Sequence, residues 1–279
     1  MTTLLRIRSH RIVSFLLCIF TFIGCSQEKF AAKKPVYLSL PSIKLKTDSV
    51  EEGSSHNKIT TAFVYLNGNT QGTYELPVTF PILLDEGENR LLIYSGIDLN
   101  GTASQKALYN AYEPLEYTFT YTEAEGNKID TITYFEDLKK RTTSINPQIT
   151  YYEVIEDFDQ SGTNFASTAR SDTTLLKTHK SSEIFTLPGE DNGAAGKFTL
   201  EPDMGFVEAV TVESYNIPIG VSNVYLELSY KCDVPLEIGV ISEYSTVPVQ
   251  EATAVINPKS EWNKIYINVI TEIEANYDA

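Results

Sequence analysis

Apolar and polar residues alternate along this sequence with a period of two, most clearly near its C-terminal end. One face of the stretch from residue 224 to residue 232 carries Val224, Leu226, Leu228, Tyr230 and Cys232. The positions between them carry Tyr225, Glu227, Ser229 and Lys231. Successive side chains of an extended strand point to opposite faces, whereas a helix brings them to one face every 3.6 residues. The pattern therefore predicts a β-strand with one buried face.

Shorter stretches of the same kind recur through the chain, and sustained helical periodicity is nearly absent. Asn67-Gly68 and Asn100-Gly101 are hairpin signals, because both residue types tolerate a positive φ. A polar, proline-containing stretch at residues 139–150 interrupts the strand pattern. We expect an all-β protein of two β-sandwich domains, at residues 35–138 and 151–279, joined by that stretch as a linker.

The first 24 residues have the parts of a secretory signal. Three arginines precede an uninterrupted apolar and small-polar run, Ile12 to Ile23. This run is too short to span a bilayer, which needs roughly 20 helical residues, but it suits the apolar region of a signal peptide. An ordinary signal peptide is one interpretation, although no A-x-A-like cleavage site follows the run. The segment Phe22-Ile23-Gly24-Cys25 resembles the lipobox of bacterial lipoproteins, with Phe22 in place of the usual Leu or Val.

The lipobox resemblance implies cleavage before Cys25 and attachment of lipid to its thiol. Each buried CH₂ of an acyl chain contributes about 0.8 kcal/mol to membrane binding, and two chains anchor a protein stably. Residues 25–34 would then form a tether. We expect an outer-membrane lipid anchor, with the folded chain facing the periplasm or the cell surface.

Charge limits the partners of the mature chain. Removal of residues 1–24 leaves 19 basic residues against 37 acidic ones, a net charge of −18. We expect no nucleic-acid partner, because binding to phosphate backbones needs Lys and Arg to release counterions. Cys232 is the one cysteine that neither leaves with the signal nor carries lipid, so it has no disulfide partner within the chain. Its place on an apolar strand face predicts a buried, inert thiol.

Both halves of the chain carry a further resemblance. Gly53 to Ile97 resembles a pattern in uncharacterised lipoproteins of Bacteroidota, and its VYLNG, QGTYELP and DEGEN segments are similar to the PEGA type of surface β-module. In the second half, IEDFDQSG, VYLELSYKCDVPLEIGVI and EWNKIYINV resemble jelly-roll domains of carbohydrate-binding modules. The resemblance implies a jelly-roll-like second domain, a surface or periplasmic location and no established activity.

Three aromatic residues of the second half are candidates for stacking on a sugar ring. Trp262 and Tyr266 share one face of a predicted strand, and Tyr225 lies on the polar face of another. Exposed aromatic rings offer apolar area with polar edges, which suits a saccharide. The alternative is that the same rings pack against a loop or against the first domain.

Residues for catalysis or metal binding are few. His56 and His179 lie in polar loops without a nucleophile motif beside them, so we expect both to be solvated and expect no zinc site. Acidic groups at Glu156/Asp157/Asp159 and at Glu190/Asp191 could flank a glycosidic bond, as in a hydrolase. Asp157 and Asp159 could instead hold a structural Ca²⁺, although a solvated turn is the simpler interpretation. We expect no other cofactor.

Three tripeptides are similar to the acceptor sequence of Bacteroidota O-glycosylation, an Asp followed by Ser or Thr and then by a small apolar residue or Thr. They are Asp48-Ser49-Val50, Asp130-Thr131-Ile132 and Asp172-Thr173-Thr174. Ser49, Thr131 and Thr173 are therefore candidate acceptors, and we expect at least two of them to be exposed.

The strand pattern stops at Ile270, and residues 271–279 read as an acidic tail. Similar lipoproteins continue past this place with further strands, so we expect the second sandwich to lack a closing strand. The strand predicted at Tyr152 to Phe158 would then have an unpaired edge, to which a partner could add a strand.

These features favour a membrane-anchored, non-enzymatic binding module, with glycan as the first expected ligand. An accessory structural subunit of an outer-membrane protein complex is the alternative. A hydrolase is the third interpretation, and it depends on two carboxylates that face each other across a cleft.

Overall fold

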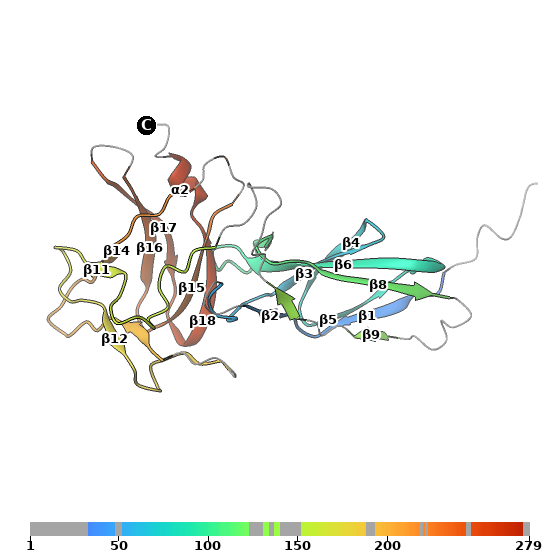
Figure 1. Cartoon of the computed structure of the whole chain (residues 1–279), viewed down its shortest axis with the longest axis horizontal. Coiled ribbons are helices and arrows are strands. Elements are labelled where there is room, and N and C mark those ends of the chain that lie inside the picture. The colour runs from blue at the N-terminus through green and yellow to red at the C-terminus, as the bar shows by residue number, and fades with distance from the viewer. Residues whose placement is uncertain are drawn as a thin grey trace, which may run out of the picture.

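A computed structural model describes residues 33–47, 52–122, 131–133, 137–139, 152–187, 193–217, 220, 223–243 and 247–275. The protein is almost entirely β, as predicted. Two lobes lie side by side (Figure 1). The first contains strands β1–β10, and the second contains strands β11–β18 and a short helix. Every hydrogen-bonded sheet takes its strands from one lobe alone.

The first lobe is a sandwich of two sheets with a small third ladder. One sheet has the order β5 (Val78–Ile82), β1 (Val36–Leu40) and β9 (Thr131–Thr133). The other has the order β4 (Asn69–Glu75), β3 (Thr61–Leu66), β6 (Gly87–Asp98) and β7 (Lys106–Leu108), with β8 (Leu115–Tyr121) also paired to β6. β2 (Lys44–Lys46) pairs with β10 (Asp137–Lys139).

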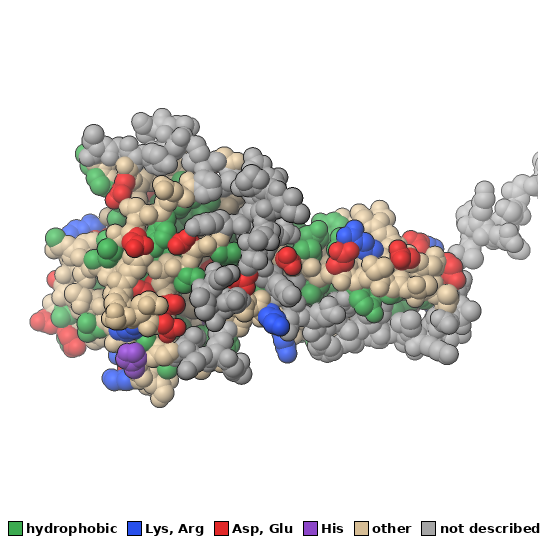
Figure 2. All heavy atoms as spheres, viewed as in Figure 1, with side chains coloured by type: hydrophobic (Ala, Val, Ile, Leu, Met, Phe, Trp, Pro, Cys, Tyr) green, Lys and Arg blue, Asp and Glu red, His purple; other side chains and the backbone are tan. Residues whose placement is uncertain are grey.

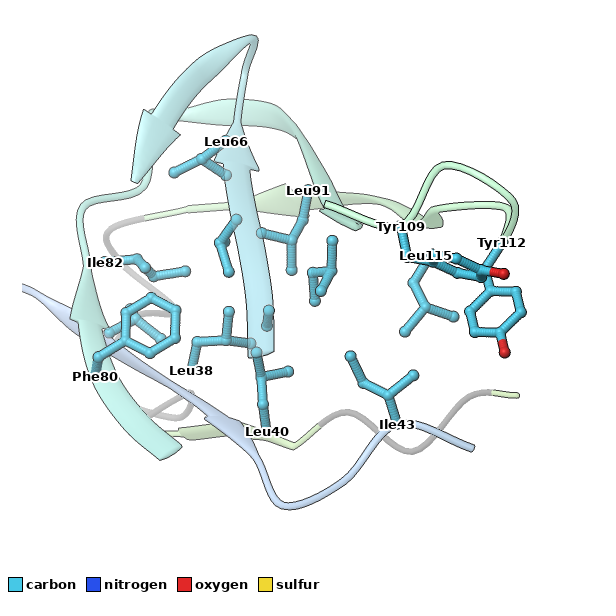
Figure 3. Close-up of a cluster of buried hydrophobic side chains, with 14 of the residues drawn as sticks. Leu38, Leu40, Ile43, Leu66, Phe80, Ile82, Leu91, Tyr109, Tyr112 and Leu115 are labelled. Atoms are coloured by element: carbon cyan, nitrogen blue, oxygen red, sulfur yellow. The ribbon is translucent and has the colours of Figure 1, made fainter. Parts of the chain in front are cut away.

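Alternation along the strands builds the core of this lobe. Figure 3 shows Leu38 and Phe80 of one sheet pointing toward Leu66 and Leu91 of the other. Leu38 and Leu91 are completely buried. Because side chains of a strand alternate between faces, the remaining positions of these strands are free to be polar.

The Asn67-Gly68 turn joins β3 to β4, as the sequence predicts. Both residues have a positive φ, of 51° and 79°. An Asn-Gly pair adopts this conformation at little cost and so closes a two-residue hairpin.

The described residues of the second lobe form four two-stranded ladders and one helix. The pairs are β11 (Phe165–Ser167) with β14 (Ala209–Thr211), β12 (Leu176–Thr178) with β13 (Ala195–Lys197), β15 (Tyr225–Cys232) with β18 (Lys259–Asn268), and β16 (Leu236–Ser242) with β17 (Val249–Ile256). A second core lies between the last two ladders and contains Tyr230, Ile256, Ile265 and Ile267. Cys232 is partly buried against this core, whereas the sequence predicts a buried thiol.

The segment Tyr152 to Phe158 is not a strand, so the prediction of an unpaired strand edge there is wrong. The Glu156 carboxylate accepts hydrogen bonds from the backbone N–H groups of Phe158 and Asn164 and from the Thr163 hydroxyl. Phe158 has a φ of 63°. Side-chain acceptors that take backbone N–H groups compete with strand pairing, and here they hold a turn.

The chain does not enter an acidic tail at Ile270, as the sequence pattern suggested. It forms the helix α2 (Ile270–Ala275), whose Ile270 and Ile273 are buried. Residues 276–279 lie outside the described residues. Within the described ranges, no helix has the length and apolar character needed to cross a bilayer.

Candidate functional site

The polar faces of β15 and β18 lie against the first lobe. Tyr266 of β18 is 1% exposed and belongs to the core of the first lobe. Tyr225 of β15 is half-buried against the same core. These two rings therefore do not form an exposed platform for sugar, and the prediction of such a platform at Tyr225 and Tyr266 is wrong. The alternative, packing against the first domain, is the observed arrangement.

Tyrosines of the first lobe complete this packing. Tyr109 and Tyr112 follow β7, and both lie at one end of the first core (Figure 3). The Tyr109 ring centroid is 4.9 Å from that of Tyr266 and 5.0 Å from that of Tyr225. The Tyr112 and Tyr266 hydroxyl oxygens are 3.1 Å apart. Aromatic pairs at such distances stabilise a contact beyond the area that they bury.

A buried ion pair lies beside the tyrosines. Lys264 Nζ is 2.8 Å from Glu227 Oε2, and their side chains are 7% and 15% exposed. The Tyr109 hydroxyl donates a hydrogen bond of 2.6 Å to the other carboxylate oxygen of Glu227. Burial raises the pKa of Tyr109 well above its usual value, and the negative charge of Glu227 raises it further. The phenol therefore stays protonated and remains a donor to Glu227.

A turn of the first lobe also covers the edge of β18. Asn100 donates its backbone N–H to the Tyr266 carbonyl oxygen at 3.1 Å, and its Oδ1 accepts the backbone N–H of Asn268 at 2.8 Å. Leu99 and Tyr266 form a parallel β-bridge. An uncovered strand edge can pair with another chain. Here Asn100 of the first lobe pairs with the backbone groups of Tyr266 and Asn268 at the edge of β18 instead.

The loop before β3 forms a third contact. His56 Nδ1 lies 2.9 Å from Ser229 Oγ of β15, and its ring centroid is 4.1 Å from that of Phe185. His56 is therefore half-buried between the lobes, and the prediction of a solvated histidine is wrong for it. The prediction holds for His179, which is exposed and whose Nδ1–H donates to the Gly193 carbonyl oxygen.

Trp262 lies at the margin of this contact between the two lobes, which we call the junction. Its ring centroid is 5.7 Å from that of Phe185, and the side chain is half-buried. The indole nitrogen is buried and has no hydrogen-bond partner within the described part of the chain. The first lobe thus covers Tyr266 and Tyr225, whereas Trp262 contacts Phe185 of the second lobe.

The remaining predicted site residues lie elsewhere. Asp157 and Asp159 are exposed, and Asp157 Oδ1 accepts the backbone N–H of Asp159. Among the described residues no group of three His, Cys, Asp or Glu side chains is placed to hold a metal ion. Thr173 is partly buried, and Thr131 belongs to β9. Residues 1–32 with Cys25, Ser49, Glu190 and Asp191 lie outside the described residues.

The sequence does not indicate the residues of the first lobe that contact the second. Tyr109 lies in a stretch without a strand pattern, and the Asn100-Gly101 pair predicts only a turn. One signal was present: two strands carry bulky tyrosines and opposite charges, Glu227 and Lys264, on the faces that alternation marks as polar. Such a combination suits a covered polar contact better than open solvent, because buried charges need partners.

Comparison of this chain with known proteins identifies no similar protein. No protein-family model matches this chain. No curated protein matches it, and no solved structure does. The functional argument therefore depends on the chain's own residues.

Proposed function

We propose that this chain is a lipid-anchored, extracytoplasmic binding protein without enzymatic activity, in which the first lobe holds the second lobe away from a membrane. The observation that carries the proposal is the arrangement of strand β6. Its first residue, Gly87, follows Asp85, which pairs with Lys33, the first described residue of the chain. Its last residue, Asp98, precedes Leu99, which bridges to the second lobe.

The tether end is defined by Lys33. Its Nζ contacts Asp85 Oδ1 at 2.5 Å, two residues before β6 begins. At the other end of β6, Leu99 forms the bridge to Tyr266 of the second lobe. A strand of 12 residues at about 3.3 Å per residue spans roughly 40 Å.

The junction holds the two lobes in one relative orientation, which keeps the second lobe at this distance from the bilayer. A flexible joint would let the second lobe turn back toward the bilayer. The packed tyrosine rings, the buried ion pair and the covered edge of β18 favour a single orientation instead. Glycan is the proposed ligand class of the second lobe, on the strength of its sequence resemblance to jelly-roll carbohydrate-binding modules. The covered Tyr225 and Tyr266 rings leave other surfaces of that lobe to serve as the binding site.

A protein partner is the second candidate, as for an accessory subunit of an outer-membrane complex. The second lobe carries most of the exposed large hydrophobic residues, including Leu176, Val212, Val247 and Val255, each more than 60% exposed. In Figure 2 hydrophobic side chains of this lobe are scattered among polar atoms on the face in view. Singly scattered apolar residues are normal on protein surfaces, so glycan remains the leading proposal.

Lipid attachment is tested with labelled palmitate in cells that express the full precursor. A Cys25→Ala precursor should lose the label and keep its signal peptide. Cys232→Ala is the matched control and should keep the label, because Cys232 lies in the folded second lobe. Label on the Cys25→Ala precursor would refute the anchor.

The ligand class is tested with a glycan array probed with the full chain in mild detergent. Saturable binding to one class of saccharide supports the proposal. An array without any bound saccharide, together with a co-purifying membrane protein in stoichiometric amount, would replace it with the accessory-subunit candidate.

A further inference from the structure

An exposed aromatic ring lies in a tightly bonded loop of the second lobe. Phe206 is 45% exposed. The Asp172 carboxylate oxygen Oδ2 accepts the backbone N–H groups of Gly205 at 2.8 Å and Phe206 at 2.9 Å. The Asp172 N–H in turn donates to the Phe206 carbonyl oxygen. The ring is thus presented at the surface by a backbone that is fixed on both sides.

Three planar polar side chains accompany this ring. The Arg170 guanidinium lies over one face of the Phe206 ring, with its carbon 5.7 Å from the ring centroid, so a ligand would stack on the other face. Arg170 donates from Nε and Nη2 to the two carboxylate oxygens of Glu208. Gln250 of β17 accepts a hydrogen bond from Arg170 Nη2 through its Oε1 and donates from its Nε2 to Glu208 Oε1. The network joins the loop that precedes β14 to strand β17, so its members come from separate parts of the lobe.

Some donors of this network have no acceptor within the described part of the chain. A guanidinium has five N–H donors, and the two on Arg170 Nη1 make no hydrogen bond to any described residue. Its side chain is 62% exposed. Gln250 uses one of its two amide hydrogens, toward Glu208. These donors are fixed by their existing bonds, since Arg170 contacts the exposed ring and Gln250 bonds to Arg170.

Ring and donors together match the chemistry of a saccharide. The face of a hexose is apolar and packs on an aromatic ring, while its hydroxyl groups need planar donors and acceptors at the rim. The charges of Arg170 and Glu208 cancel, so a neutral sugar is favoured over an acidic one. A stable protein interface buries about 800 Å² per partner around an apolar centre, and one ring with a charged surround does not provide this.

We propose that Phe206, Arg170 and Gln250 form a binding subsite for a neutral hexose residue of a glycan. This inference depends on the proposed function of the chain as a glycan-binding protein, and it assigns that function to one surface of the second lobe. The Glu208 carboxylate acts as a positioning group, because it accepts hydrogen bonds from both Arg170, which lies over the ring, and Gln250.

Calorimetric titration of the full chain with neutral gluco-, manno- and galacto-oligosaccharides tests the subsite, with uronate oligosaccharides as the charged comparison. Phe206→Ala should weaken binding of the neutral oligosaccharide by about tenfold, since a stacked ring contributes about 1.4 kcal/mol. Glu208→Gln should weaken it through loss of the Arg170 position. Phe198→Ala is the matched control, because Phe198 is another exposed phenylalanine of the same lobe, 37% exposed and outside the network. Equal melting temperatures show that the variants are folded.

The outcomes separate the subsite from the broader proposal. Loss of binding in Phe206→Ala with full binding in Phe198→Ala supports the subsite. Neutral-sugar binding that Phe206→Ala leaves unchanged overturns the subsite and leaves the proposed function in place. Binding of uronates alone overturns the choice of a neutral sugar. A chain that binds no saccharide overturns both.

Discussion

Glu227 and Lys264 are neighbouring charges on β15 and β18 that the first lobe removes from solvent. Their attraction is strong only because both are covered, and it must offset the cost of taking two charges out of water. Tyr109 contributes by donating to the carboxylate. A single carboxylate thus links side chains of both lobes.

Substitution of Glu227 by Gln should lower the free energy of unfolding by about 3 kcal/mol, because it leaves the Lys264 charge buried without a partner. The second change Lys264→Met should restore much of this loss, since it removes the orphaned charge. Urea denaturation of the two variants measures both effects. A Glu227→Gln variant as stable as the original chain would show that the pair is not buried in solution.

Glu208 controls a second residue-scale effect, the response of stability to acid. Hydrogen bonds from Arg170, then from Thr168 and Gln250, lower the pKa of the Glu208 carboxyl from 4.5 to about 2. A carboxyl whose folded pKa is depressed adds stability that is fully present above its unfolded pKa and disappears as the pH falls through the folded one. The affected window therefore runs from about pH 4.5 down to about pH 2.

The melting temperature of the original chain should fall across this window, and Glu208→Gln should make the fall shallower. Glu201→Gln is the control, because Glu201 is an exposed carboxylate without an ion partner in the described part of the chain. Thermal melts at pH steps between 2 and 7 give the comparison. Identical profiles for the Glu208 and Glu201 variants would contradict the assignment of the window to Glu208.

At the scale of elements, the hairpin turn after β6 acts as a cap for the edge of β18. Gly101 has a φ of +73°, and a Cβ atom built on it would lie 2.8 Å from the Ile265 Cδ1 atom of the second lobe. Gly68 has nearly the same conformation, with a φ of +79°, and nothing within 4 Å of its Cβ position. The two turns therefore differ in their surroundings and not in backbone strain.

Valine at Gly68 should cost about 1–2 kcal/mol, the penalty for a left-handed residue with a Cβ. Valine at Gly101 should cost about 1–3 kcal/mol more, because it must also displace the buried Ile265 side chain. Denaturant unfolding of the two variants measures the difference. Equal losses of stability would mean that Gly101 does not pack closely against Ile265 in solution.

For the whole molecule, the junction joins two cores that the strand topology keeps apart. Tyr266 belongs by sequence to a strand of the second lobe and by packing to the core of the first. Unfolding of either lobe therefore exposes buried surface of the other. We expect the two lobes to unfold together for this reason.

Calorimetry of the full chain should show one cooperative transition, with equal calorimetric and van't Hoff enthalpies. Tyr266→Ala should lower the stability of the molecule by about 3–5 kcal/mol, the usual cost of removing a large buried side chain. Tyr117→Ala, at a tyrosine of β8 that is 40% exposed, is the control and should change little. Two separate transitions in the original chain would contradict the coupling of the lobes.

Local patterns predicted the strands and several turns of this protein. Asn67-Gly68 closes the expected hairpin between β3 and β4. The stretch from residue 224 to residue 232 contains the expected strand, β15. These features depend on the geometry of an extended chain and on the φ preference of two residue types. Neither depends on what lies across the molecule.

Tertiary contacts decided the remainder. Alternation marks the Tyr225 and Tyr266 positions as one face but cannot say whether water or protein covers it. Tyr109 covers that face and Asn100 covers the edge of β18, and each is separated from these strands by more than a hundred residues. The segment Tyr152 to Phe158 has the composition of a strand, yet the Glu156 carboxylate takes the N–H groups that a strand would offer a neighbour. Burial and hydrogen-bond partners are properties of the assembled fold, and a period of two contains no information about them.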